Sequence, residues 1–399
     1  MPKWAPRRVV VTGLGAVASC GIGKDAFFEG LNGPHATDPR RVDDFDPADW
    51  FDPKEARHLD RFAQMAIAAA QQAVDDAGPT ETDPIRSGVV FGTGVGGLAT
   101  LQGQIQVSIN KGARWVSPRL VPMIMGNAGA AGISMRFGFR GPCETIVTAC
   151  AAGTQSIGYA MWLIRTGRCD AVITGSSEAA ATPVDGMAPI GIAAFSNMTA
   201  LSTSGNSRPF DRRRDGFVIG EGAGALVIEE LDHAKARGAR IYAELMGSAS
   251  TADAYHITAP APGGTGAINC MELALEDAGI TTADVAHINA HGTSTPLNDL
   301  AEAEAIEKVF GRPGPPVTSI KGVLGHSLGA AGALEAVASV MTIERGEIPP
   351  TAGLEEQDPE IHLDIVTGAP RPFTPGPVLS NSFGFGGHNG CLVFGPLSS

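Results

Sequence analysis

Three side chains that lie far apart in the sequence form a set suited to nucleophilic chemistry. Cys150 lies in the segment VTACAAGTQ, His291 in NAHGTST and His326 in KGVLGHSLGAAG. A cysteine attacks as its thiolate, and an imidazole can take the thiol proton or stabilise charge that develops later in a reaction. The set therefore predicts one nucleophile with two histidine partners that handle protons or stabilise negative charge.

The local structure expected around Cys150 is consistent with a nucleophile. A strand-like segment, ETIVTA, precedes it, and the run CAAGTQSIGYAMWLIRTG predicts a helix that begins at or just before Cys150. Free backbone N–H groups and the positive end of the helix dipole would lower the pKa of the thiol. A lone cysteine in such an Ala- and Gly-rich run is more often a small buried hydrophobic residue, so this hypothesis depends on the two histidine motifs.

The composition is that of a globular, acidic protein. The 399 residues are 43% hydrophobic and 18% charged, and the formal net charge of −13 argues against general affinity for nucleic acid or anionic membranes. No long uninterrupted apolar stretch and no secretory leader are visible, so we expect neither membrane insertion nor export. The six cysteines show no CxxC pair and no clustering with histidine, which argues against a metal site and against disulfides. We expect a cytoplasmic protein.

The order of hydrophobic segments predicts an internal duplication. Short β-branched runs alternate with Ala-rich helical stretches, which is typical of α/β folds with buried sheets. Strand-like ETIVTA leads into a helix between Gly153 and Gly167, and strand-like PVTSIKG leads into a helix between Gly332 and Gly346, with the same spacing. We therefore predict two similar halves, residues 1–238 with the cysteine and residues 239–399 with both histidines.

A glycine-rich turn at residues 92–97 matches the GxGxxG pattern of dinucleotide-binding proteins. That pattern needs an acidic residue about 20 positions further on to bind the ribose. No Asp or Glu occurs between Leu98 and Cys143. We interpret the turn as a tight connection packed against other backbone.

A second pattern suggests a rival enzyme class. The segment from Gly325 to Gly329 matches the GxSxG nucleophile elbow of serine esterases, and Asp358 or Asp364 and then His388 follow in the required order. The hypothesis leaves Cys150 and His291 without a role. It also leaves too little sheet after the elbow.

Five motifs together resemble one known family. VTACAAG, RPFDRRRDGFVIGEGAGALVIEE, NAHGTSTPLND, KGVLGHSLGAAGALE and SNSFGFGGHNG are similar to the β-ketoacyl-acyl-carrier-protein synthases of the thiolase-like superfamily, and most similar to the elongating type II enzymes. The resemblance implies the thiolase fold, in which two duplicated halves stack as α-β-α-β-α layers. It also implies a homodimer whose partner borders the acyl pocket, and acyl and malonyl substrates delivered by acyl carrier protein.

The third catalytic position distinguishes the branches of this superfamily. Thiolases lack HGTST and use a second cysteine, and the initiating synthases pair cysteine with histidine and asparagine. Here that position is His326, as in the elongating class. The chain-length factors of polyketide systems have lost the nucleophile, whereas Cys150 is present. A catalytic ketosynthase of a type II polyketide pathway keeps all three residues and remains the alternative.

The resemblance assigns further residues around the reaction centre. Lys321 and Glu335 match a buried pair beside His326, and Asp299 matches an acid near His291. Thr293 and Thr295 match positions that bind the phosphopantetheine arm. The arm carries the substrates, so no separate cofactor or metal is expected.

The same resemblance implies a gated acyl pocket. The backbone N–H groups of Cys150 and Phe385 would form an oxyanion hole, Phe383 and Phe385 would gate the pocket, and Val95 would line it. His388 departs from the family pattern, in which many relatives carry threonine beside the gate. Four basic residues would dock the acidic carrier protein: Lys54, Arg57, His58 and Arg114.

Overall fold

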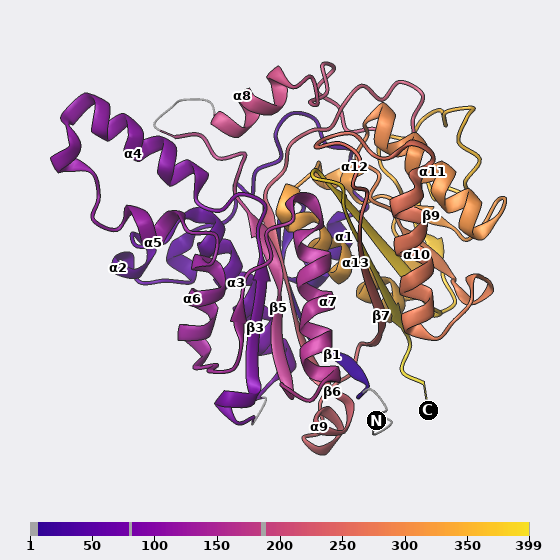
Figure 1. Cartoon of the computed structure of the whole chain (residues 1–399), viewed down its shortest axis with the longest axis horizontal. Helices are drawn as coiled ribbons and strands as arrows, with labels where there is room; N and C mark the ends of the chain where they lie inside the picture. The colour runs from indigo at the N-terminus through magenta and orange to yellow at the C-terminus, as the bar shows by residue number, and fades with distance from the viewer. Residues whose placement is uncertain (1–6, 80–81, 185–188, 399) are drawn as a thin grey trace.

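A single mixed sheet of eleven strands runs through the molecule (Figure 1). The computed structural model describes residues 7–79, 82–184 and 189–398. The strand order is β4-β3-β5-β6-β1-β7-β13-β12-β8-β9, and the short β2 (Gly21–Ile22) pairs with β1. A separate ribbon pairs β10 (Glu347–Ile348) with β11 (Arg371–Pro372).

The sheet consists of two halves with the same topology. When the five main strands of each half are numbered along the chain, their order across the sheet is 3-2-4-5-1 in both halves. The first strand of each half, β1 or β7, lies at the centre, where the two pair antiparallel. The parallel and antiparallel pairings also match from half to half. The predicted duplication is therefore confirmed. The strands of the first half are β1 (Val9–Ala18), β3 (Ser87–Gly92), β4 (Cys143–Glu144), β5 (Ala171–Glu178) and β6 (Gly222–Glu230). Those of the second half are β7 (Ala243–Ala252), β8 (His287–Asn289), β9 (Val317–Thr318), β12 (Val378–Gly384) and β13 (His388–Gly395).

Helices complete the α-β-α-β-α layering that the resemblance predicted. One outer layer contains α3 (Arg61–Ala77) and α6 (Ala128–Phe137), and the other contains α10 (Thr265–Ala278) and α11 (Pro296–Phe310). The middle layer contains α7 (Ala152–Arg165) and α13 (Ala331–Arg345). The remaining helices are α1 (Lys24–Gly30), α2 (Pro53–Ala56), α4 (Leu98–Lys111), α5 (Leu120–Ile124), α8 (Ile190–Asn197), α9 (Leu231–Ala236) and α12 (Lys321–Leu324).

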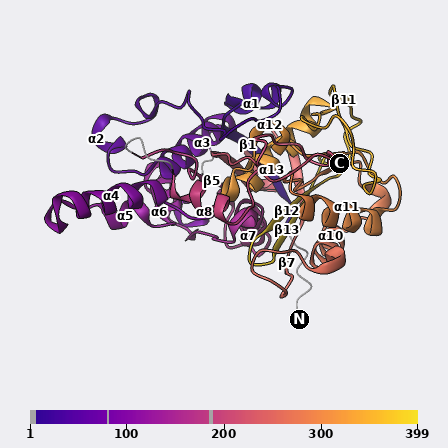
Figure 2. The same cartoon turned by 90° about the horizontal axis from the view of Figure 1, so that it is seen from above.

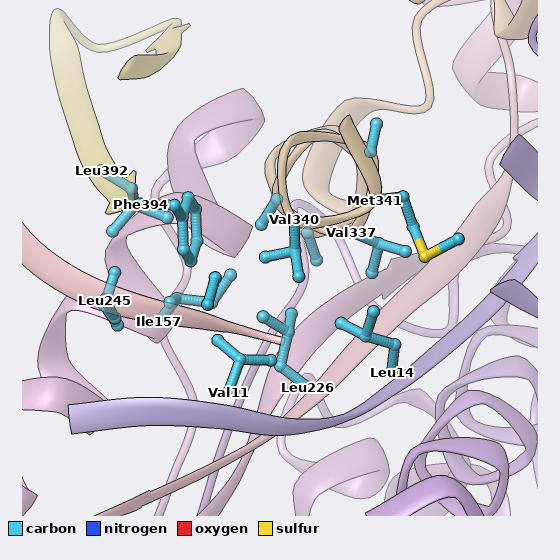
Figure 3. Packing of buried hydrophobic residues seen from close by; sticks show 14 of the residues in the cluster. Val11, Leu14, Ile157, Leu226, Leu245, Val337, Val340, Met341, Leu392 and Phe394 are labelled. Carbon is cyan, nitrogen blue, oxygen red and sulfur yellow. The ribbon is translucent and has the colours of Figure 1, made fainter. Parts of the chain in front are cut away.

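The middle layer packs tightly against both halves of the sheet. Residues 331–343 of α13 are all buried, as expected for a helix that is apolar on nearly every side. Figure 3 shows Val337, Val340 and Met341 of α13 facing Leu14 of β1 and Leu226 of β6. This packing holds α13 at the molecular centre, and the same cluster includes Ile157 of α7.

The two central helices approach each other backbone to backbone. A Cβ atom on Gly153 would lie 2.5 Å from the backbone nitrogen of Ala333, and one on Gly332 would lie 2.6 Å from that of Thr154. Only glycine fits at such a crossing. Each helix is preceded by a 3-10 turn, Ala149–Ala151 before α7 and Leu328–Ala330 before α13, so the two turns lie side by side.

Figure 2 shows α4 and α5 projecting from the first half, at the opposite end of the molecule from α10 and α11. Within the described residues, no helix combines the length and apolar character needed to cross a bilayer.

Candidate active site

The fold brings the three predicted reactive residues together. Cys150 lies on the 3-10 turn before α7, His291 follows β8, and His326 follows α12. The Nε2 atom of His326 lies 3.0 Å from the sulfur of Cys150, and the ring centroids of His291 and His326 are 5.4 Å apart. All three side chains are buried and line one cavity of about 480 Å³.

The surroundings of Cys150 correct one expectation. Burial raises the pKa of the Cys150 thiol to about 11, and the nearby Lys321 charge and the Phe385 N–H group, which both lower it, do not offset this. The predicted lowering of the pKa by the helix start is therefore wrong, because removal of the thiolate from water outweighs the local dipoles. The resting residue is a neutral thiol in contact with an imidazole.

Both histidines are neutral in this pocket. Burial, together with the nearby positive charge of Lys321, holds the pKa values of His291 and His326 well below their usual range. The Nζ atom of Lys321 lies 3.3 Å from Nδ1 of His291, and an ammonium can only donate. The His291 proton therefore resides on Nε2.

Lys321 is itself held by a buried ion pair with Glu335. Its ammonium also donates to the backbone oxygen of His291 over 2.6 Å. Ser382 donates to Glu335 over 3.1 Å, and Thr154 donates to Ser382 over 2.7 Å. The predicted pair is present, but its hydrogen bonds reach His291 rather than His326. The network connects α12, α13, β12 and α7.

The acid that holds the backbone of His291 is Glu302, which the sequence reasoning missed. It accepts from the N–H groups of His291 at 2.8 Å and Gly292 at 2.7 Å, and burial raises its pKa to about 7. The predicted Asp299 instead accepts from the N–H groups of Phe210 and Ser294. A possible signal was helical spacing, because Glu302 lies one turn after Asp299 on the buried face of α11.

The residues predicted for the substrate path line the same cavity: Thr293, Thr295, Phe383, Phe385 and Val95. The hydroxyl oxygens of the two threonines are 2.9 Å apart. The Phe385 N–H group is hydrogen-bonded to Cys150. A Cβ atom on Gly384 would lie 3.1 Å from the Cys150 nitrogen, so glycine leaves that N–H group accessible. Both N–H groups therefore lie beside the side chain of Cys150.

An aromatic cluster surrounds the predicted gate. Phe385 contacts Phe195 of α8 with ring centroids 6.3 Å apart, and Phe195 contacts Phe217 at 5.4 Å. Neither Phe195 nor Phe217 was identified from the sequence. The gate is also tied to a neighbouring loop, because the Gly386 N–H donates to the Ile257 oxygen over 2.7 Å. His388 begins β13 beside Gly386 and is not part of the cavity lining.

The rival esterase triad does not assemble. Asp358 is paired with Arg214, and Asp364 is paired with Arg371. His388 pairs with Gly384 at the start of a β-hairpin strand. Each candidate acid is therefore occupied by an arginine rather than by a histidine. The glycine turn at residues 92–97 packs closely against other backbone, as expected.

The predicted docking residues lie on the first half. Lys54 and Arg57 are exposed on and just after α2, and Arg114 is exposed on the turn before α5. His58 is partly exposed, and its pKa is lowered by partial burial and by the positive charges of Arg119, Lys54 and Arg57. Arg119 therefore lies beside this group and is a member that the sequence reasoning missed.

Comparisons with known proteins agree with this architecture. Residues 33–234 match the family model "Beta-ketoacyl synthase, N-terminal domain", and residues 242–355 match "Beta-ketoacyl synthase, C-terminal domain". Proteins named 3-oxoacyl-[acyl-carrier-protein] synthase 2 from Synechocystis and Staphylococcus aureus are 44% and 45% identical. The matches cover 99% and 97% of this chain, and 99% and 98% of the relatives.

Solved structures show the same relationship. A β-ketoacyl synthase from Burkholderia phymatum superposes with a TM-score of 0.90 at 33% identity, over 98% of this chain and all of the other. The ishigamide ketosynthase/chain length factor gives 0.90 at 36% identity, over 99% of this chain and all of the other. With two family models across most of its length and full-length relatives at this identity, the chain belongs to the β-ketoacyl synthase family.

Proposed function

We propose that the protein is a β-ketoacyl-[acyl-carrier-protein] synthase of type II that elongates fatty acyl chains by two carbons. The observation that carries the proposal is the 3.0 Å contact between the Cys150 sulfur and His326, with His291 in the same buried cavity. The reaction is a decarboxylative condensation of an acyl group on Cys150 with malonyl-acyl-carrier protein.

In the first half-reaction, Cys150 attacks the thioester of an acyl-carrier protein. Nε2 of the neutral His326 takes the thiol proton as the carbon–sulfur bond forms, and this proton then passes to the departing pantetheine thiolate. The oxyanion of the tetrahedral intermediate accepts hydrogen bonds from the N–H groups of Cys150 and Phe385. Because His326 takes the proton during the attack, Cys150 need not be a thiolate beforehand.

In the second half-reaction, malonyl-carrier protein occupies the cavity and loses CO2. The electron pair of the broken carbon–carbon bond forms an enolate, whose oxygen accepts a hydrogen bond from Nε2–H of His291. The nucleophilic carbon of the enolate then attacks the acyl-Cys150 carbonyl, the carbon–sulfur bond breaks, and the departing Cys150 thiolate takes up one proton from solvent. Lys321 orients His291 through Nδ1. Decarboxylation supplies the carbanion, so the chemistry requires neither a redox cofactor nor a metal.

The fatty-acid assignment is favoured over the polyketide alternative by the relatives. The full-length relatives described above are named 3-oxoacyl-[acyl-carrier-protein] synthase 2, and they are 44–45% identical to this chain. A type II polyketide ketosynthase solved with its acyl-carrier protein shares 33% over 98% of this chain, with a TM-score of 0.88. That structure supports a carrier protein as the partner for either product class.

The carrier protein docks on a basic surface formed by residues of the N-terminal half of the chain. An acidic enzyme with a net charge of −13 needs a local positive surface to attract an acidic carrier. Lys54, Arg57, His58 and Arg114 provide it, and Arg119 adds to it. The thioester would then enter the cavity that Thr293 and Thr295 line.

The protein forms a homodimer through the free edge of its sheet. β4 pairs only with β3 among the described strands, and both of its residues are exposed. Met135 on α6 and Val147 just after β4 are 78% and 56% exposed, which is unusual for a soluble monomer at a strand edge. The adjacent α5 packs on the Gly96–Gly97 turn, so a partner here would border the acyl pocket.

A cytoplasmic location is consistent with this function. All six cysteines lie within the described residues and are free thiols, which fits a reducing compartment.

Replacement of the nucleophile separates the two half-reactions. Cys150→Ala is expected to abolish condensation, whereas Cys150→Gln is expected to release CO2 from malonyl-carrier protein without elongation. An amide occupies the place of the acylated thiol, and both histidines and the oxyanion hole remain. Radiolabelled CO2 release and product mass spectrometry measure the two activities. Elongation at the native rate by Cys150→Ala would refute the assignment.

Replacement of His291 should remove decarboxylation while acyl transfer to Cys150 survives, whereas replacement of His326 should slow acyl transfer to Cys150. Loss of one preorganised donor or base costs roughly a hundredfold or more in rate. We expect His326→Ala to slow acylation more than His291→Ala does, because only His326 contacts the sulfur. His287→Ala is the matched control, because it removes a buried imidazole from β8 outside the cavity. Condensation at the native rate by His291→Ala or His326→Ala would contradict the role proposed for that histidine.

Charge reversal of Lys54 and Arg57 to glutamate should impair carrier-bound substrates selectively. We expect kcat/KM for acyl-carrier protein to fall about tenfold or more at low salt, with little change for the matching CoA thioester, because distant charges act on carrier encounter. Lys235→Glu with Lys308→Glu reverses two exposed charges elsewhere. Equal losses for both substrate types would mean that docking occurs at another surface.

Disruption of the β4 edge should yield monomers. The unmodified protein is expected to elute as a dimer in light-scattering chromatography, and Met135→Glu with Val147→Glu is expected to shift it toward the monomer mass, because charge at a buried apolar contact is costly. Leu273→Glu on α10, also an exposed apolar position, should leave the dimer intact. A monomeric unmodified protein, or a dimeric double variant, rules out this interface.

A further inference from the structure

A buried carboxylate with no role in the proposed reaction lies close to Cys150. Glu178 is the last residue of β5 and is fully buried. Its Oε2 atom accepts from the Gly94 N–H over 2.7 Å, and Thr93 donates to Oε1 over 3.3 Å. The N–H groups of Val95 and Gly329 also donate to this carboxylate. These partners are all donors, so the site is built for a negative charge.

The internal duplication shows which residues of the second half are equivalent to those around Glu178. Glu178 and Gly384 end the equivalent strands β5 and β12, and each pairs with the first residue of the next strand. The turns before α7 and α13 are equivalent too, because Ala149 and Leu328 share a left-handed backbone, with φ of 50° and 49°. Cys150 is therefore the counterpart of Gly329.

The two equivalent turns differ in what lies against their N–H groups. At Cys150 the neighbouring strand ends in Gly384, whose missing side chain leaves the N–H group open to a substrate oxygen. At Gly329 the neighbouring strand ends in Glu178, whose carboxylate accepts that N–H group. An anion from the protein therefore sits where the other half would bind the reaction's oxyanion.

We propose that Glu178 is a positioning residue whose carboxylate fills the duplicate oxyanion hole and whose negative charge adds to the burial that disfavours a thiolate at Cys150. The bonds to Gly94, Val95 and Gly329 join the first-half turn of the acyl pocket to the second-half turn that follows His326. Val95 and Leu328 both line the cavity, so these bonds hold two parts of its wall together. This inference rests on the proposed nucleophilic role of Cys150.

The charged groups around Cys150 determine the direction in which its pKa should change when Glu178 is replaced. Lys321 favours the thiolate, whereas Glu178 and Glu335 disfavour it, and His326 contacts the sulfur. Burial raises the pKa of Glu178 to about 7, so the carboxylate is ionised in the alkaline range in which the thiol titrates. Removal of its charge should therefore lower the pKa of Cys150.

The test is the pH dependence of Cys150 alkylation by iodoacetamide, followed by peptide mass spectrometry in the full-length protein. Glu178→Gln keeps the side-chain shape and removes the charge. We expect the midpoint of its alkylation profile to fall by on the order of one pH unit relative to the unmodified protein, as for loss of a nearby unit charge at an effective dielectric constant of about 20.

Two controls separate charge from packing. Thr93→Val removes a hydrogen bond to Glu178 and retains the carboxylate, so its profile should match that of the unmodified protein. Glu221→Gln removes another buried carboxylate, one paired with Arg61, and should lower the thermal midpoint without a pH shift.

An unshifted Glu178→Gln profile, or an equal shift in Thr93→Val, overturns the proposal. The pH midpoint of alkylation reports ionisation of the thiol and not condensation, so this outcome is distinct from failure of the proposed function, which Cys150→Ala reports.

Discussion

The contact between α7 and α13 is the constraint on which the rest of the site depends. Gly153 and Gly332 let the two backbones touch at the centre of the molecule. The turn that carries Cys150 and the turn that follows His326 then lie side by side, although the two residues are 176 positions apart in the sequence. A side chain at either glycine would separate the helices and, with them, the nucleophile and its proton acceptor.

Burial of this crossing determines the electrostatics of the pocket. It disfavours charge on the thiol and on both imidazoles, so the three reactive side chains are uncharged in the resting site. Lys321 is tolerated there because Glu335 neutralises it from the neighbouring turn of α13. The same ammonium fixes the tautomer of His291. A neutral thiol beside a neutral imidazole can transfer its proton when the substrate arrives, without a standing thiolate.

The duplication also explains why the two halves carry different tasks. Each half offers a strand end, a left-handed turn and a helix start in equivalent positions. In one copy the turn carries a cysteine and the strand ends in glycine. In the other copy the turn carries glycine and the strand ends in glutamate. One copy is therefore open to a substrate, whereas the other is closed by the protein's own carboxylate.

Sequence reasoning found much of the site because spacing and motif content are local properties. Cys150, His291 and His326 were identified from their motifs, and the matching glycines of two helices revealed the duplication. Lys321 and Glu335 were assigned through the resemblance. The reasoning missed Glu302, Phe195 and Arg119, because each acts through neighbours that are distant in the chain. It named Asp299 as an acid near His291 but did not find Glu302, which accepts the N–H groups of His291 and Gly292.

The sequence by itself determined the alternation of strands and helices, the duplicated helices and the identity of the reactive side chains, since these follow from residue type and period. Only the tertiary structure decided the protonation states and the division of work between the histidines. Those depend on burial and on distances between segments that the chain order does not specify. Desolvation raised the pKa of Cys150 against the expected influence of its helix, and proximity assigned His326 to the sulfur and Lys321 to His291.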